Sequence, residues 1–188
     1  MNPKSHTLFH FTKSPDVLKK IIKDGFWPRY CLEDVGWLGY KEFDFIAYPM
    51  VCFCDIPLSR VEEHVNFYGE FGIGLTKEWA MSNKLTPILY VAPNNHIPKT
   101  FRDLVDHTFN MEGDAKVEAK RTVRYLLAHS KPIDGNMIVN GGFFPKEFHQ
   151  ESEWRYVPKS DAIEDYLKRN EYEDEENLEI QNSVTKLH

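Results

Sequence analysis

The chain has 188 residues, a formal net charge of −6, 41% hydrophobic residues and 14% aromatic residues. This length suits one domain with a sizeable core, and the acidic balance argues against strong non-specific binding to nucleic acid. No apolar run approaches the roughly 20 residues that cross a bilayer, and residues 1–13 lack the apolar stretch of a secretory signal, so we expect a soluble cytoplasmic protein without a membrane partner.

The start of the chain predicts a strand, a capped helix and a long loop. Residues 7–12 form an apolar and β-branched run that is typical of a strand. Ser14 is suited to cap a helix that begins at Pro15 and stops at Gly25, because proline fits the first helical position and glycine the position after the last. Residues 26–50 are irregular and rich in aromatic rings, which favours an ordered loop that serves as a lid or a binding segment.

The remaining elements mix strands and helices without the alternation of a parallel sheet. We expect strands at 51–54, 71–80, 87–91, 136–139 and 151–157, helices at 58–68, 101–128 with a break near Gly113, and 161–169, and a turn at 141–145. This mixture favours an α+β fold with a single domain over residues 1–169. The acidic residues of 170–188 indicate a tail that is either solvated or used to dock a basic partner.

The segment Glu151-Ser152-Glu153-Trp154-Arg155-Tyr156 alternates charged and bulky residues. In an extended strand this alternation puts two carboxylates and a guanidinium on one face. Because like charges repel, the two acids are either paired with cations as scaffolding or gathered at a site. As chemistry, one carboxylate can stabilise a sugar cation while the other orients or deprotonates a nucleophile.

Two further segments carry candidate binding residues. His10 lies on the first strand beside Thr12, and an imidazole with a hydroxyl can either hydrogen-bond within the core or hold a ribose or an amide. Tyr68 ends the predicted helix 58–68 and is either a packing ring or a surface on which a flat ligand stacks. The glycines that follow are not a dinucleotide fingerprint, because here the helix precedes the strand.

The three cysteines favour packing rather than a disulfide framework or a metal site. Cys52 and Cys54 lie on one face of a predicted strand, and the third cysteine is Cys31. A zinc site would need two more ligands at suitable spacing, and the sequence offers none, so we expect no metal.

The blocks Val51-Cys52-Phe53-Cys54-Asp55-Ile56-Pro57-Leu58, Tyr68-Gly69-Glu70-Phe71-Gly72-Ile73-Gly74 and Glu151-Ser152-Glu153-Trp154-Arg155-Tyr156, together with His64, resemble the AbiGi family, which is named for abortive phage resistance and labelled an antitoxin. The order of His10, Tyr68 and Glu153 resembles the His-Tyr-Glu arrangement of the ADP-ribosyltransferase fold, and the opening Leu8-Phe9-His10-Phe11-Thr12 is similar to its DarT-like branch.

The second resemblance implies an ADP-ribosyltransferase-like split β-sheet core with flanking helices, and NAD as the substrate. It implies that His10 contacts a ribose or the adenosine part of NAD, that Tyr68 stacks on nicotinamide, and that Glu153, or else Glu151, is the catalytic acid. No arginine in the middle of the chain matches the residue that grips phosphate in that fold, and Arg29 is the candidate for this role.

Three functions follow from these patterns. The first is an ADP-ribosyltransferase of phage defence that modifies a macromolecular acceptor, either protein or nucleic acid. The second is a non-catalytic antitoxin that binds a cognate toxin. The third is a nucleic-acid-binding protein whose aromatic residues in 26–50 stack on bases, which the net charge disfavours without a local basic groove.

Overall fold

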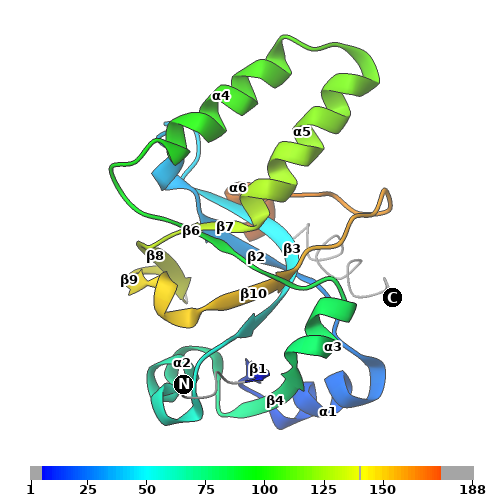
Figure 1. Cartoon of the computed structure of the whole chain (residues 1–188), viewed down its shortest axis with the longest axis vertical. Coiled ribbons are helices and arrows are strands. Elements are labelled where there is room, and N and C mark those ends of the chain that lie inside the picture. Colours follow the sequence, from blue (N-terminus) through cyan, green and yellow to red (C-terminus); the bar gives the residue numbers. More distant parts are fainter. Residues whose placement is uncertain (1–5, 140, 175–188) are drawn as a thin grey trace.

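The structure is a computed structural model that describes residues 6–139 and 141–174, and Figure 1 shows how its elements are arranged. The strands are β1 (Thr7–Thr12), β2 (Arg29–Asp34), β3 (Phe45–Cys54), β4 (Phe71–Thr76), β5 (Thr86–Pro87), β6 (Leu89–Val91), β7 (Ser130–Pro132), β8 (Asp134–Val139), β9 (Gly142–Glu147), β10 (Glu153–Tyr156) and β11 (Leu167–Lys168). The helices are α1 (Pro15–Asp24), α2 (Glu62–Tyr68), α3 (Lys77–Ser82), α4 (Ile97–Phe109), α5 (Gly113–Ala128) and α6 (Arg169–Glu173), with 3₁₀ helices η1 (Gly36–Leu38), η2 (Leu58–Arg60) and η3 (Phe148–Glu151).

Strand β3 is the central strand of the main sheet. Its first half pairs with β2 and β11, and its second half pairs with β1 and β10, all antiparallel. Strand β4 extends the sheet beyond β1, and β5 extends it beyond β10. Nearly all of β3 is buried, as expected for a central strand that is covered on both faces. The mixture of helices with a mainly antiparallel sheet confirms the α+β class, while the ADP-ribosyltransferase-like split core stays a prediction.

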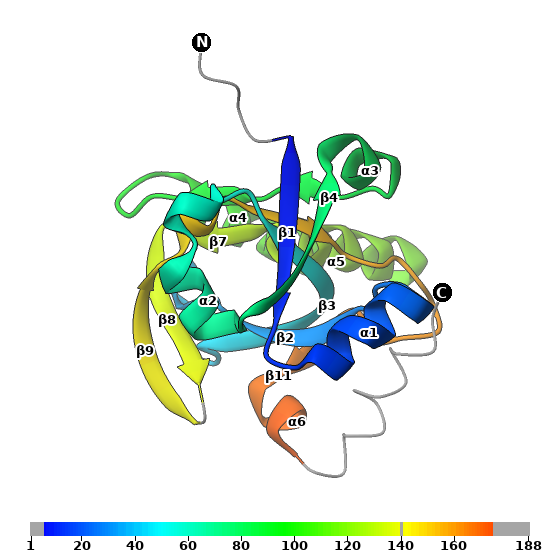
Figure 2. The same cartoon turned by 90° about the horizontal axis from the view of Figure 1, so that it is seen from below.

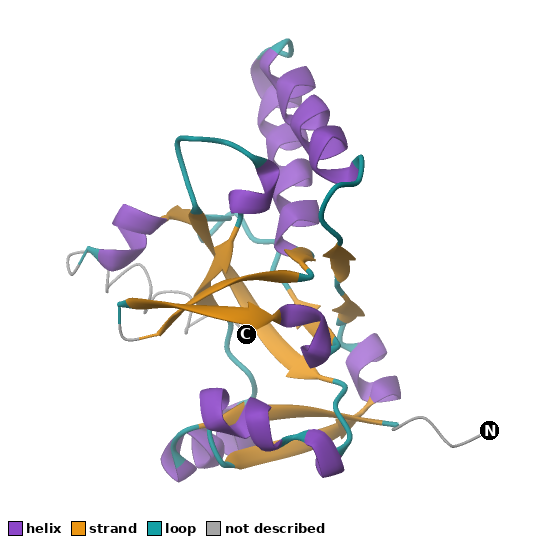
Figure 3. Cartoon of the chain, turned by 90° about the vertical axis from the view of Figure 1, so that its left-hand side faces the viewer, coloured by secondary structure: helices purple, strands orange, loops and turns teal. Residues whose placement is uncertain are grey.

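The helices lie mainly at the two ends of the molecule. The hairpin of α4 and α5 stands away from the sheet at one end, as Figures 1 and 3 show. Strands β1 and β4 lie at the other end with α1, α2 and α3, and Figure 2 looks onto this end. The hairpin β8–β9 flanks the middle of the molecule.

Buried side chains form a cluster at each end. Leu38, Tyr48, Phe101 and Leu127 belong to the cluster that roots the α4–α5 hairpin on β3. A second cluster packs α3 onto β1 and β3 and includes Leu8, Phe53 and Ala80. Members of both clusters, among them Met50 and Phe53, line the cavity described below.

The predictions for the first strand, the first helix and the break in the long helix are confirmed. Strand β1 occupies the predicted residues, and α1 runs from Pro15 to Asp24 with the Ser14 hydroxyl accepting from the Asp16 N–H. The predicted long helix is two helices, and the break falls between Phe109 and Gly113. Gly113 has φ +58°, a conformation that glycine adopts at little cost.

The prediction of a loop over residues 26–50 is wrong, because this segment contains β2 and the first half of β3. Strand β3 is buried along nearly its whole length, so its sequence shows no alternation of apolar and polar residues. Four of the aromatic residues proposed to stack on bases, Trp37, Tyr40, Phe43 and Tyr48, instead pack in the first cluster. These rings are therefore not available to stack on bases.

Other element predictions need smaller corrections. The predicted strand 71–80 ends at Thr76, whose hydroxyl caps α3, and the predicted turn 141–145 lies largely in β9. The predicted helix 161–169 is instead an irregular segment followed by β11. Helix α6 crosses the predicted boundary at residues 169 and 170, and residues 175–188 of the predicted tail lie outside the described part of the chain.

Gly69 allows α2 to end against β1. Its φ is +112°, and a Cβ atom at this position would clash with the Thr12 carbonyl oxygen. Gly69→Ala should therefore lower the free energy of unfolding by roughly 3 kcal/mol, because backbone strain adds to a clash that neither strand nor helix end can relieve. Gly113→Ala, with a positive φ but open space around it, is the control and should cost about 1 kcal/mol by urea denaturation. Equal losses for the two variants would contradict this account.

Candidate functional site

One cavity of about 1090 Å³ reaches most of the predicted site residues. His10, Arg29, Tyr68, Glu151 and Glu153 all line it, although they come from five different elements. Thr12 does not line it, but faces a neighbouring cavity of about 510 Å³ that His10 and Tyr68 also border. The predicted imidazole, phenol and carboxylates are thus brought to a common space, while the roles assigned to them stay predictions.

The backbone around Ser152 separates the two glutamates. Glu151 ends η3, Ser152 adopts a left-handed conformation with φ 45°, and β10 begins at Glu153. The prediction that Glu151 lies on the strand is therefore wrong, whereas Glu153 and Arg155 share one buried face of β10 as predicted. The reversal at Ser152 still aims both carboxylates at the same cavity.

A network of six buried ionic side chains, three acidic and three basic, forms part of the cavity wall. Each is at most 8% exposed, and Arg155 is fully buried. The members are Glu33 of β2, Lys131 of β7, Lys146 of β9, Glu151 of η3, and Glu153 and Arg155 of β10. We call this set the ion network. Its formal charges cancel, which is the condition under which burying so many ions is tolerable.

Glu153 is held on both of its carboxylate oxygens. Arg155 donates from Nε to Oε1 at 2.6 Å and from Nη2 to Oε2 at 3.0 Å, and Lys131 Nζ lies 3.3 Å from Oε2. Burial raises the pKa of this carboxyl, but Arg155 and Lys131 outweigh burial and hold the pKa well below the usual range. Glu153 is therefore an ionised, fully paired carboxylate.

Arg155 connects Glu153 to the rest of the fold. Its Nη2 also donates to Glu33 Oε2 at 2.8 Å, and its Nη1 donates to the Ala128 carbonyl at 2.7 Å at the end of α5. Lys131 lies 3.5 Å from both Glu33 Oε2 and Glu151 Oε2. Strands β2, β7 and β10 and helix α5 are thus fastened at one point.

Glu151 is held by a second set of donors. The Tyr68 hydroxyl donates to its Oε1 at 2.7 Å, and Lys146 Nζ lies 2.7 Å from the same oxygen. Burial raises the pKa of Glu151, but Lys131 and Lys146 lower it further than burial raises it. These contacts tie α2 and β9 to the ion network.

Two neighbouring side chains pack against the ring of Tyr68. The His64 ring lies 4.4 Å from it between centroids, and Lys146 Nζ lies 4.6 Å from its centroid. Burial, followed by the charge of Glu151, raises the pKa of the phenol, so Tyr68 is a neutral donor. A flat ligand would need to displace one of these neighbours to stack on this ring.

His10 makes several contacts within the fold, whereas the side chain of Arg29 makes few. His10 Nδ1 donates to the Cys52 carbonyl at 2.8 Å, and its ring packs against Phe26 and Phe53. Burial lowers the pKa of His10, so its imidazole is neutral, with Nε2 left to face other groups. Arg29 is exposed at the start of β2, and its side chain makes no hydrogen bond or ion pair with the described residues.

Sequence reasoning missed Glu33, Lys131 and Lys146. Glu33 fell in the segment that was predicted as a loop, and Lys131 and Lys146 carried no motif. A signal for the counter-ions existed only in general form, since two buried acids require nearby cations. Their positions could not be found without the tertiary pairing of β2, β7 and β9.

The cysteines line the same cavity as free thiols. Burial raises the pKa of Cys31 and of Cys54 to about 12 in each case, which suppresses the reactive thiolate at neutral pH. Within residues 6–139 and 141–174, no three His, Cys, Asp or Glu side chains are grouped so that they would hold a metal ion.

Comparison with known proteins gives the family. Residues 24–187 match the family described as "Putative abortive phage resistance protein AbiGi, antitoxin". The chain belongs to the AbiGi family. A relative from Lactococcus lactis subsp. cremoris, named "Abortive phage resistance protein AbiGi", is 29% identical over 159 residues, which is 74% of this chain and 64% of that protein.

The AbiGi match covers some of the predicted site residues and not others. It includes Arg29, Tyr68, Glu151 and Glu153, whereas His10 and Thr12 precede it. The chain spans less than two thirds of the Lactococcus protein, and no solved structure matches it. In the described part of this AbiGi chain, no helix combines the length and apolar character that a membrane crossing requires.

The buried imidazole of His64 predicts a loss of stability in acid. Burial lowers the pKa of His64 from 6.5 to about 4, so between these values the unfolded chain binds a proton that the folded chain excludes. The free energy of unfolding should therefore fall as the pH falls from 6.5 to 4. His64→Phe, which keeps a ring beside Tyr68, should show a shallower fall in urea denaturation at pH 6.5, 5.5 and 4.5. An unchanged slope would show that His64 does not cause the loss.

Proposed function

We propose that this AbiGi protein acts by binding a partner, as the antitoxin of an abortive-infection pair, and that its carboxylates stabilise the fold rather than catalyse a reaction. The observation that carries the proposal is the closure of the ion network. Both oxygens of Glu153 are bonded to cations of its own chain, and the six charges cancel. The description of the family as an antitoxin supports the same conclusion.

A catalytic carboxylate would need a different environment. A general base or acid must be able to exchange a proton near neutral pH, and a carboxylate that stabilises a sugar cation must face it with unpaired charge. Glu153 meets neither need, because Arg155 and Lys131 keep it ionised and neutralise its charge. A toxin partner that has no affinity for the unfolded chain would in turn stabilise this protein by mass action.

Glu153→Gln separates a structural carboxylate from a catalytic one. The amide removes one negative charge and leaves Arg155 and Lys131 in excess, so the free energy of unfolding should fall by about 3 kcal/mol. In a protein of this size such a loss lowers the melting temperature by about 10 °C. The measurement is thermal and urea denaturation followed by circular dichroism.

The matched control is Glu147→Gln in strand β9, which pairs with β8 in a separate two-stranded sheet. Glu147 is exposed and accepts one hydrogen bond, from Gln150 at 3.3 Å, so its loss should change stability by less than about 0.5 kcal/mol. If Glu153→Gln is as stable as this control, the carboxylate is not structural and the proposal fails.

The second candidate is an ADP-ribosyltransferase that uses NAD to modify a macromolecule. One observation favours it: His10, Arg29, Tyr68, Glu151 and Glu153 line a single cavity whose volume is slightly above the usual range for ligand pockets. Its aromatic lining and Arg29, which is unpaired among the described residues, fit a dinucleotide. The paired state of Glu153 and the covered ring of Tyr68 do not fit the roles that the resemblance gives them, so the site geometry supports no reaction step.

NAD itself distinguishes the two candidates. If this chain acts only by binding a protein partner, 1 mM NAD should leave its melting temperature unchanged within about 1 °C, and nicotinamide should not be released. A transferase should be stabilised by NAD, less so after Arg29→Ala, and should release nicotinamide at a rate that Glu153→Gln abolishes. Release that survives Glu153→Gln would remove this glutamate from the mechanism.

A further inference from the structure

The outer edge of β4 is the feature that the ion network and the cavity leave unexplained. Strand β4 ends the main sheet and pairs only with β1 among the described strands. Its residues are Phe-Gly-Ile-Gly-Leu-Thr, and four of the six are exposed. Open strand edges are usually protected by charges, prolines or bulges, because they invite pairing with another chain. Strand β4 carries no charge and no proline.

The packing of β1 makes this edge more apolar. Phe9 and Phe11 lie opposite Gly74 and Gly72, and their rings occupy the space above these glycines. A Cβ atom at Gly72 would lie 2.8 Å from the Phe11 ring, and one at Gly74 would lie 3.0 Å from the Phe9 ring. The aromatic surface of β1 therefore extends over β4 toward the open edge.

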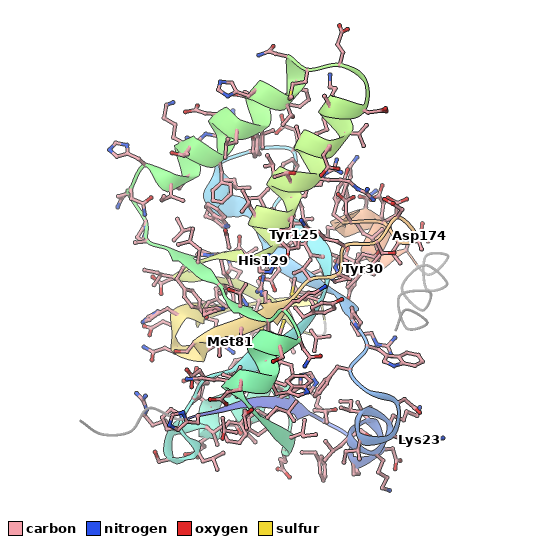
Figure 4. The ribbon with its side chains drawn as sticks, turned by 45° about the vertical axis from the view of Figure 1, so that its right-hand side comes forward. Lys23, Tyr30, Met81, Tyr125, His129 and Asp174 are labelled. Carbon is pink, nitrogen blue, oxygen red and sulfur yellow. The ribbon has the colours of Figure 1, made fainter. Side chains whose placement is uncertain are left out.

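The two helices that contact β4 add exposed apolar side chains at the same end of the molecule. Helix α1 leaves Ile22 67% exposed, and α3 leaves Met81 58% exposed. Figure 2 shows α1 and α3 on one side of β1 and β4, and Figure 4 shows Met81 and Lys23 of α1 at the end opposite the α4–α5 hairpin.

We infer that a second copy of this chain pairs with the open edge of β4, strand against antiparallel strand, about a two-fold axis. A strand without charge can face its own copy without repulsion. When Ile73 lies opposite the Ile73 of the copy, Phe71 lies opposite Leu75, so large apolar side chains meet on one face. On the other face the glycine positions meet beneath the phenylalanine rings.

A stable pair needs contacts beyond the two strands. Stable interfaces bury about 1,200 Å² or more in total, and two six-residue strands alone fall short of this area. Helices α1 and α3 both contact β4, so we expect their exposed side chains Ile22 and Met81 to supply the added area, each of them twice about a two-fold axis. This inference is independent of the proposed antitoxin function.

Sedimentation equilibrium of the full chain tests the pairing. Between about 1 and 100 µM the mass should approach twice 22.1 kDa, the mass of one chain. Ile73→Glu and Ile73→Lys should each weaken dimerisation at least 10-fold, because each puts like charges opposite one another. An equimolar mixture of these two variants should recover the mass of two chains, which a folding defect would not do.

Two exposed positions give a second variant and its control. Met81→Glu in α3 should weaken dimerisation at least 3-fold, whereas Phe109→Glu, at the 60% exposed end of α4, should not. A single-chain mass at every concentration overturns the inference, and so does a dimer that both Ile73 variants leave intact.

Discussion

The fold depends on the neutralisation of Arg155, a fully buried cation near the middle of the molecule. Its guanidinium joins Glu153 on its own strand, Glu33 on β2 and the last turn of α5. A guanidinium cannot lose its charge at any physiological pH, so the surrounding chain must supply the compensating carboxylates. This constraint fixes how β2, β10 and the α4–α5 hairpin meet.

The same constraint shapes the cavity. Lys131 spans Glu33, Glu151 and Glu153, and Glu151 holds Tyr68 of α2 and Lys146 of β9. The residues that the sequence pattern would assign to catalysis are therefore those that close the cavity wall. On the function proposed above, their convergence reflects charge balance among buried groups. A catalytic site would likewise demand acids and cations close together. Membership of the AbiGi family, described as an antitoxin, agrees with the structural explanation.

Local signals in the sequence predicted local structure well. The cap at Ser14, the break near Gly113 and the alternation of Glu153 with Arg155 each follow from the chemistry of a few neighbouring residues. The prediction for segment 26–50 failed because β3 is buried along nearly its whole length and so shows no alternation of apolar and polar residues. Part of the site was predictable, because Glu151 and Glu153 stood out as two acids one residue apart. Their partners Glu33, Lys131 and Lys146 are set by strand pairings that no local pattern encodes.

A double-mutant cycle between Glu153 and Arg155 tests the central claim most directly. Glu153→Gln, Arg155→Gln and the double variant are compared with the native chain by urea denaturation. If the two side chains neutralise one another in the core, the double variant should be at least about 2 kcal/mol more stable than the sum of the single losses predicts. Losses that add within about 0.5 kcal/mol would show that Glu153 is not the internal counter-ion of Arg155.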